Sequence, residues 1–425
     1  MPTKRETLAT HFPAMRNADY RWLWASSAIA AASLWAMLMA RGWLVFELSD
    51  SGLAVGAVTF AAMAPWALAP IGGAFADRFD RGRIVIWGRV ALMGLALALA
   101  ALAFADVIAV WHIILMAAGS GVVRIFEIPA EQALIPNTVD EETLLNAITL
   151  ASLARHGSRF VGPLLGAPLI AGVGPGWLFV MGAVLYGVAV LVFLRVQIRS
   201  SGGLAEAGGG VAAAGRGIQE AVRYVGQHSP VMLIFALTMF HCMLTMSFDS
   251  MLPIFATDAL GRGSGMFGSL LAGVGVGALV GTLALSFVRN GSARGAIFFG
   301  MGLLSAVSMI WLGVAADPVT AVAAAVLVGG SQASFMALSS TFIQSVVPDA
   351  IRGRVMSLYV LLAAGTMAVM IFGNGALADV ISVRILFIAS PSVFIVLLLA
   401  WSLSRTDLRA VYRTGKLPSM GASSG

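Results

Sequence analysis

The sequence predicts an all-α membrane protein in which twelve transmembrane helices form two pseudo-symmetric halves of six helices each. Hydrophobic residues make up 59% of the 425 residues and charged residues only 11%, and the mean hydropathy is +0.91. A soluble domain is roughly 45–50% apolar and about 25% charged, so this composition is that of a multi-pass membrane protein. No charge-rich block is large enough to form a soluble catalytic domain.

Apolar runs of about 20 residues or more, long enough for a hydrocarbon core of roughly 30 Å, occur twelve times. Helices are expected because they satisfy their backbone hydrogen bonds within the segment. The polar N-terminus through Tyr20 lacks the short apolar core and cleavage site of a signal peptide, so the first run is expected to be a true span. The predicted spans are 21–46, 53–76, 84–105, 107–128, 143–172, 175–198, 230–256, 265–288, 295–315, 318–346, 355–380 and 384–404.

The Lys and Arg residues indicate which ends of the spans lie in the cytoplasm. With the N-terminus inside, cytoplasmic ends and loops hold nineteen of the 26 Lys and Arg residues, and outer loops hold only Arg262 and Arg384. We therefore expect a protein of the cell inner membrane with both termini in the cytoplasm. This distribution explains the formal charge of +6 without a nucleic-acid partner. The other five lie within or near spans: Arg41, Arg89, Arg124, Arg155 and Arg159.

The middle of the chain predicts a linker between two repeated halves. Ser200 to Gly217 is rich in Gly, Ala and Ser, as flexible connections are, and Gly217 to His228 has the one-sided apolar pattern of an interfacial helix. Two pairs of matching segments, at the ends of spans four and ten and of spans two and eight, have offsets near half the chain length and indicate duplication. The expected units are an N-terminal half over 1–198, a cytoplasmic linker over 199–229, a C-terminal half over 230–405 and a cytoplasmic tail over 406–425.

A short charged segment joins the second and third predicted spans. It ends a helix with small residues and places carboxylates and arginines at the water boundary, which suggests a cytoplasmic latch. The segment reads Gly72-Gly73-Ala-Phe-Ala-Asp77-Arg78-Phe-Asp80-Arg81-Gly-Arg83. It resembles the signature between spans two and three of the major facilitator superfamily, the twelve-helix secondary transporters, although Asp80 stands where that family often has Gly. Further segments of both halves resemble the bacterial branch that includes siderophore and macrolide exporters: Trp43–Asp50, Arg124–Ala130 and Arg352–Ser357.

The resemblance implies a gate at this segment. Asp77, after Gly73, would meet the positive N-terminal end of span eleven near Gly353 and hold the outward-open state. Arg78 and Arg81 would reach acidic groups or lipid phosphates, or they serve the positive-inside pattern alone.

Span five carries a pattern that bears on the direction of transport. Gly162-Pro163-x-x-Gly166 is similar to a signature associated with antiporters that export drugs, although the full pattern is not kept because Ala167 replaces the closing Gly. The plainer interpretation is that these small residues let helices pack closely. The pattern favours export.

Charges within the bilayer cost roughly 2.5–3.5 kcal/mol on insertion scales, so they are candidate functional residues. Folding spans four and five about residue 139 places Arg124 beside Arg155, and Glu127 shares the face of Arg124. With Arg159, these side chains form a predicted polar cluster that either contacts an anionic substrate and gates protons or is a structural ion-pair network. Arg41 is a further candidate for substrate contact, a counter-ion of an acidic side chain in span seven, or a residue that snorkels outward.

Span seven contains His241, Thr245 and Asp249, which lie along one slanting face of a regular helix. A His changes charge near neutral pH, and a buried Asp is shifted toward that range by desolvation. His241 and Asp249 are therefore predicted to couple transport to protons. The alternative for Asp249 is a hydrogen bond across helices near the outer mouth.

The sequence contains no motif of an enzyme or an ATPase. A single Cys, Cys242, leaves neither an intrachain disulfide nor a Cys-based metal site. His-x-x-x-His, His-Glu-x-x-His, Gly-x-Ser-x-Gly and the phosphate-binding loop are all absent, so no enzymatic activity, cofactor or metal is expected.

The leading interpretation is a secondary transporter that exports amphipathic small molecules, drug-like or siderophore-like, by proton-coupled alternating access. Its expected partners are the small-molecule substrate, protons and the lipid bilayer, and we expect a monomer. Two alternatives stay open: an importer of a small organic anion, and a transporter-like sensor without transport.

Overall fold

The computed structural model describes residues 12–197, 211–288 and 291–415, which form helices and no strand. Ten helices or helical runs in this part of the chain are long and apolar enough to cross a bilayer, which confirms the predicted multi-pass helical architecture. They are α2 (Ala18–Ser49), α5 (Arg81–Phe104), α6 (Val110–Leu134), α8 (Pro175–Phe193), α12 (Ser264–Ser286), α13 (Gly291–Val314), α14 (Pro318–Val346), α15 (Asp349–Ala378), α16 (Val383–Ser404) and the run from α10 (Ser229–His241) to η6 (Phe255–Ala259).

Four further helical segments complete the bundle. α3 (Gly52–Met63) continues through η2 (Ala64–Leu68) into α4 (Ala69–Arg78), and α7 runs from Glu141 to Val173. α9 (Val211–Gln227) includes most of the predicted interfacial helix, and α17 (Thr406–Thr414) follows α16. Residues 198–210 of the predicted linker and 416–425 of the tail lie outside the described residues.

Side chains at the helix ends fix where several helices begin. Ser51 accepts a hydrogen bond from Ala54 N at 3.3 Å and starts α3. Asp80 accepts one from Arg83 N at 2.8 Å and starts α5, so the aspartate that replaces a family glycine is a helix cap. Asp317 starts α14 by accepting from Val319 N at 3.0 Å and from Thr320 N at 3.1 Å, and its hydrogen bonds with Thr320 and Val319 lower the pKa of the Asp317 carboxyl.

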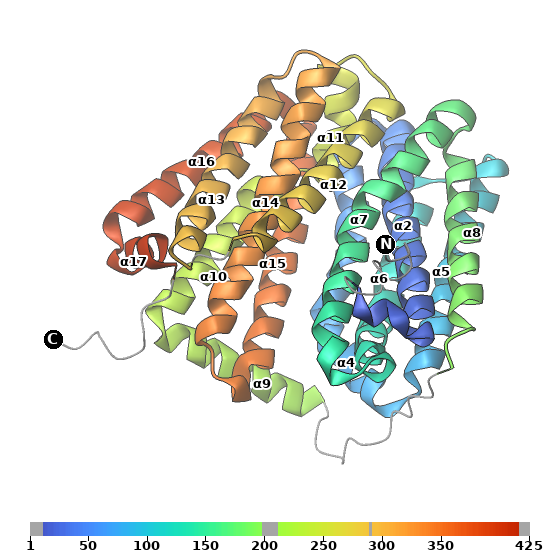
Figure 1. The fold of residues 1–425 in the computed structure, drawn as a ribbon. Helices are drawn as coiled ribbons and strands as arrows, with labels where there is room; N and C mark the ends of the chain where they lie inside the picture. The colour runs from blue at the N-terminus through green and yellow to red at the C-terminus, as the bar shows by residue number, and fades with distance from the viewer. Residues whose placement is uncertain (1–11, 198–210, 289–290, 416–425) are drawn as a thin grey trace, which may run out of the picture.

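The helices form two groups that follow the order of the chain (Figure 1). In that view α9 crosses the lower end of the bundle, α2 and α4–α8 lie on the right, and α10 and α13–α17 lie on the left. α12 packs against α7 and so joins the groups. Close approach is possible there because glycines face the partner: a Cβ on Gly275 would lie 2.6 Å from Phe160 N.

The hydrophobic core is shared between the two groups at one end of the bundle only. At the end opposite α9, which we call the far end, one cluster of buried side chains joins residues of both groups, such as Phe46, Leu178, Phe267 and Leu312. At the α9 end, the first group has its own cluster around Tyr20 and Phe193. The second group has another, with Phe335 and Val411 among its members. The groups are thus packed together at the far end and have separate cores toward α9.

Candidate functional site

A buried ion-pair network lies among α2, α5 and α6. Arg89 is fully buried, and its Nε donates to Glu127 Oε1 at 3.1 Å while its Nη2 donates to Glu131 Oε2 at 2.6 Å. Its Nη1 also donates to Ser26 Oγ. The two glutamates lie one turn apart on α6, so one guanidinium spans both.

One carboxylate oxygen of this network has no partner. Glu127 is 3% exposed, and its Oε2 makes no hydrogen bond with any part of the chain that the structure describes. A buried carboxylate is costly unless its oxygens are paired. Glu127 therefore has one oxygen bound to Arg89 and one buried oxygen without a hydrogen-bond partner among the described residues.

Two more arginines, Arg124 on α6 and Arg41 on α2, lie near this network. Arg124 Nη2 donates to the hydroxyl of Tyr186 on α8 at 2.6 Å. Arg41 on α2 donates to Ser120 Oγ at 2.9 Å and to Met37 O at 3.2 Å. The guanidinium groups of Arg41 and Arg124 lie close enough to repel each other, and Glu127 and Glu131 attract Arg124. Arg41 is thus held by neutral partners beside a like charge, an arrangement that an anion would stabilise.

A further charged interaction lies between the two helix groups. Arg159 on α7 lies with its Cζ 4.9 Å from the centre of the Trp35 ring on α2, a cation–π contact. It also attracts Asp249 of η5 (Asp249–Met251) electrostatically. The structure therefore places Arg159 toward Asp249 instead of in the cluster of Arg124, and Arg41 bonds to α6 instead of acting as the counter-ion of Asp249.

The helix that carries Asp249 is broken in the middle. α10 ends at His241, a π-helical turn follows over Cys242–Met246, and Ser247 and Phe248 are not helical before η5 begins. Gln332 on α14 donates to Thr245 O at 2.6 Å, and Asn374 on α15 donates to Ser247 O at 2.7 Å. These amides satisfy carbonyls that the break leaves without a helical partner, as interrupted helices inside membranes require.

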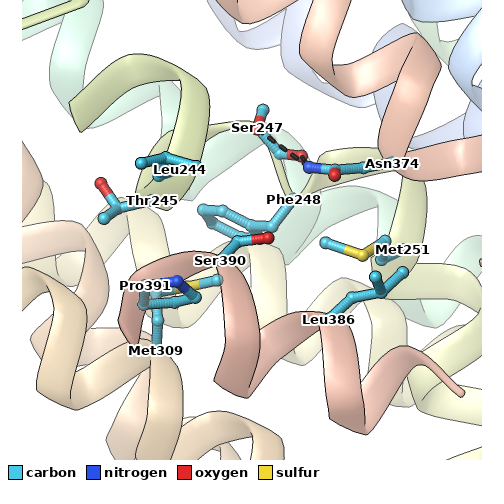
Figure 2. A pocket seen from close by; sticks show the side chains of 10 residues that line it. All are labelled: Leu244, Thr245, Ser247, Phe248, Met251, Met309, Asn374, Leu386, Ser390 and Pro391. Carbon is cyan, nitrogen blue, oxygen red and sulfur yellow. Dashed lines mark hydrogen bonds between the residues drawn. The ribbon is translucent and has the colours of Figure 1, made fainter. Parts of the chain in front are cut away.

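Beside the break lies a small cavity (Figure 2). Its volume is about 10 Å³, the space of roughly one water molecule. Asn374 points toward Ser247, and Phe248 covers the centre of the view. The lining residues come from the broken helix, α13, α15 and α16: Leu244, Thr245, Ser247, Phe248, Met251, Met309, Asn374, Leu386, Ser390 and Pro391.

His241, which ends α10 before the break, has partners other than those of Asp249. Its Nε2 lies 3.0 Å from Ser305 Oγ, and its ring stacks on Phe335 with centroids 4.1 Å apart. Phe394 contacts the ring edge-on. The single face predicted for His241, Thr245 and Asp249 assumed a continuous helix, so that geometry was wrong.

The sequence matches a known family along nearly its whole length. A family model described as "Transmembrane secretion effector" matches residues 9–418. The chain belongs to this family of major facilitator superfamily transporters. The chain is 22% identical to the Staphyloferrin A transporter of Staphylococcus aureus (strain NCTC 8325 / PS 47) over 298 residues, which are 68% of this chain and 73% of that protein.

Solved transporter structures share the fold of this chain. The nucleoside transporter NupG matches with a TM-score of 0.72 at 13% identity, over 91% of this chain and 98% of that one. A mutant of the peptide transporter POT in complex with sulfate matches with a TM-score of 0.73 at 15% identity, over 92% and 96%. At these identities the likeness concerns the fold alone.

The remaining predicted site residues lie elsewhere. Arg155 on α7 is exposed, and among the described contacts none joins it to Arg124. A Cβ on Gly162 would lie 2.6 Å from Trp35 Cβ, so this glycine lets α7 and α2 touch. Pro163 is buried within α7, and Gly166 faces Met39 and Leu178. Within the described chain, no three His, Cys, Asp or Glu side chains gather as metal ligands would.

The charged segment after α4 lies at the α9 end. Arg81 donates to Ala76 O and Ala133 O, both at 3.3 Å, and so ties the ends of α4 and α6. Arg78 is exposed, and so is Gly353 at the start of α15. The side-chain surroundings of Gly73 and Asp77 lie outside the described residues, so the predicted contact of Asp77 with α15 stays a prediction.

Four residues around these arginines were not among the predicted site residues: Arg89, Glu131, Ser26 and Tyr186. Arg89 was noted only as an intramembrane charge, although folding α5 and α6 as an antiparallel pair about residue 108 puts it level with Glu127. Depth makes Arg89 a candidate partner of Glu127 but does not select it over the other arginines at similar depth. For Tyr186 no sequence signal distinguishes it from a packing residue.

Proposed function

We propose that this transporter exports amphipathic small molecules, drug-like or siderophore-like, across the inner membrane in exchange for protons. The observation that carries the proposal is the buried Glu127, which has one oxygen bound to Arg89 and the other without a partner. The family description, a secretion effector, supports the outward direction. A monomer with both termini in the cytoplasm is part of the proposal.

Alternating access would use twelve spans in two halves of six. The run α3–η2–α4 and the 33-residue α7 would add two spans to the ten long apolar ones. Cores that are joined at the far end and separate toward α9 are what a transporter open on the α9 side would have. Rocking of the halves would then open the far end and close the α9 end.

Proton binding would act through the arginines. When Glu127 takes a proton, its contact with Arg89 would no longer be an ion pair, and Arg89 would keep an ion pair with Glu131 alone. When Asp249 takes a proton, the attraction between α7 and η5 weakens. We propose Glu127 and Asp249 as proton carriers, with His241 as a further candidate, and Arg41 and Arg124 as substrate contacts. Arg155 would meet substrate only along its entry path.

A transport assay tests this proposal. Inside-out vesicles with an acidic lumen are given a panel of fluorescent apolar cations, siderophores and organic anions. The native protein should accumulate one of these classes, and Glu127→Gln and Asp249→Asn should abolish the dependence on the pH gradient. Asp106→Asn is the matched control, because Asp106 lies exposed at a positive φ of 60° that Asn tolerates. Accumulation that persists unchanged in both variants would contradict the proposed carriers.

A second candidate function is uptake of a small organic anion. It is favoured by the adjacent guanidinium groups of Arg41 and Arg124, whose closest bonds are to Ser120, Tyr186 and a backbone carbonyl. The same assay in right-side-out vesicles separates the two. Inward movement of an anion that is lost in Arg41→Gln and Arg124→Gln, with no outward movement of any probe, would replace export by uptake.

A further inference from the structure

The far end of the bundle is closed by a direct backbone contact between α3 and α15. A Cβ on Gly375 would lie 2.2 Å from Gly52 O, and one on Gly56 would lie 2.9 Å from Ile371 O. Only glycine fits so close an approach. The beginning of α3 and the end of α15 therefore meet without side chains between them.

One carboxylate ties these two helix ends together. Asp379, the residue at the C-terminal cap of α15, accepts hydrogen bonds from Ser51 Oγ at 2.7 Å, Gly52 N at 2.5 Å and Leu53 N at 3.2 Å. The two amides belong to the first turn of α3, whose backbone donors have no partner within that helix. Asp379 thus caps a helix more than 300 residues away in the chain.

The position of Asp379 is unfavourable for its own helix. A negative charge at a helix C-terminus opposes the helix dipole, whereas the same charge at an N-terminus is favourable. Asp379 is therefore stabilised by α3 only while the two helix ends touch. Ser51 keeps its own bond to Ala54 N, so α3 retains a local cap when Asp379 leaves.

The other end of α15 contacts α9. Arg354 pairs with Glu220, and a Cβ on Gly353 would have no neighbour within 4 Å. Among the described contacts, the side-chain hydrogen bonds that join the start of α3 to α15 are those of Asp379.

We propose that Asp379 is a latch that holds the far end closed and that releases α3 when the far end opens. The residue makes this contact across the two helix groups, independently of Glu127, Asp249 and any substrate. Asp379 acts on the equilibrium between the open and closed far end, so this role does not depend on the direction of transport or on its coupling to protons.

Spin-label distances test the latch in purified protein without substrate or pH gradient. In a Cys242→Ser background, Trp111→Cys and Ile385→Cys place labels on exposed positions at the far end, and Leu145→Cys with Leu403→Cys does so at the α9 end. Asp379→Asn should increase the ratio of far-end-open to far-end-closed molecules by about fivefold or more, the smallest effect usual for coupled sites. The α9-end labels should approach each other in the same fraction of molecules.

Asp317→Asn is the matched control, because Asp317 also caps a far-end helix but bonds only within its own loop and α14. It should leave both distance distributions unchanged. Asp379→Ala should repeat the shift of Asp379→Asn, and an unchanged unfolding temperature would show that either variant is folded. Far-end distances that stay as in the native protein in both Asp379 variants would overturn the latch, whereas a failure of transport in vesicles would leave it standing.

Discussion

At the scale of single residues, Arg89 has the most partners of the intramembrane charges. It binds two glutamates and a serine while fully buried, and its Cζ lies 5.4 Å from the centre of the Phe193 ring. A buried ion pair contributes little beyond an apolar replacement, yet removing one partner is strongly destabilising because the other charge stays buried. The network therefore limits which substitutions the protein tolerates.

Arg89→Ala should destabilise the protein by about 3–5 kcal/mol, because Glu127 and Glu131 would lose their shared counter-charge. The unfolding temperature of the purified protein in detergent measures this effect. Arg83→Ala, at an exposed position of the same helix, should change it little. Equal unfolding temperatures for Arg89→Ala and the native protein would show that the network does not support the fold.

The sequence predicted Arg124 and Glu127 in one polar cluster with Arg155 and Arg159. Glu127 lies in the buried network of Arg89, whereas Arg124 donates to Tyr186. The sequence did not predict which arginine binds Glu127. Arg89 on α5 and Arg155 on α7 are expected near the depth of Glu127, and only side-chain packing decides between them. Arg155 was placed beside Arg124 by depth alone. Depth follows from the folding of two spans, but the direction in which a side chain points depends on the third helix that packs there.

At the scale of helices, glycines decide which helices touch. α7 carries Gly157 and Gly162, but only Gly162 faces another helix closely: its Cβ would lie 2.6 Å from Trp35 Cβ and 2.7 Å from Ala32 O. Nothing lies within 4 Å of a Cβ at Gly157. Comparing substitutions at Gly162 and Gly157 therefore distinguishes the effect of close packing from the intrinsic effect of glycine on a helix.

Gly162→Ala should lower the stability by roughly 1–3 kcal/mol, as overpacking does, since α2 and α7 would have to move apart. Gly157→Ala should be neutral or stabilising by up to about 1 kcal/mol, because Ala favours a helix over Gly. Denaturant unfolding of the two variants measures the difference. If the two substitutions had the same effect, the contact at Gly162 would not be tight.

The lengths and order of the helices follow closely from the apolar runs, because the bilayer sets the length of each span. The break in the run that starts with α10 does not follow, because no proline or glycine lies between His241 and Asp249. It depends on amides of Gln332 and Asn374, which come from helices far along the chain. Local sequence rules therefore cannot locate it.

At the scale of the whole molecule, two helix groups share a core at the far end and separate toward α9. The charges gather between these regions, with Glu127 in the first group and Asp249 facing the first group from the second. A proton taken by either carboxylate would, as proposed, weaken a contact between helices. In the proposed mechanism this links proton movement to the exchange of the open and closed ends.

The most direct test of proton-coupled export is proton movement driven by substrate alone. Purified protein is placed in liposomes that contain a pH-sensitive dye, and a gradient of the substrate identified in vesicles is imposed without a pH gradient. Protons should move opposite to the substrate in the native protein and in Asp106→Asn, and Glu127→Gln should move no protons. Substrate movement without proton movement in the native protein, or native proton flux in Glu127→Gln, would contradict proton-coupled export through Glu127.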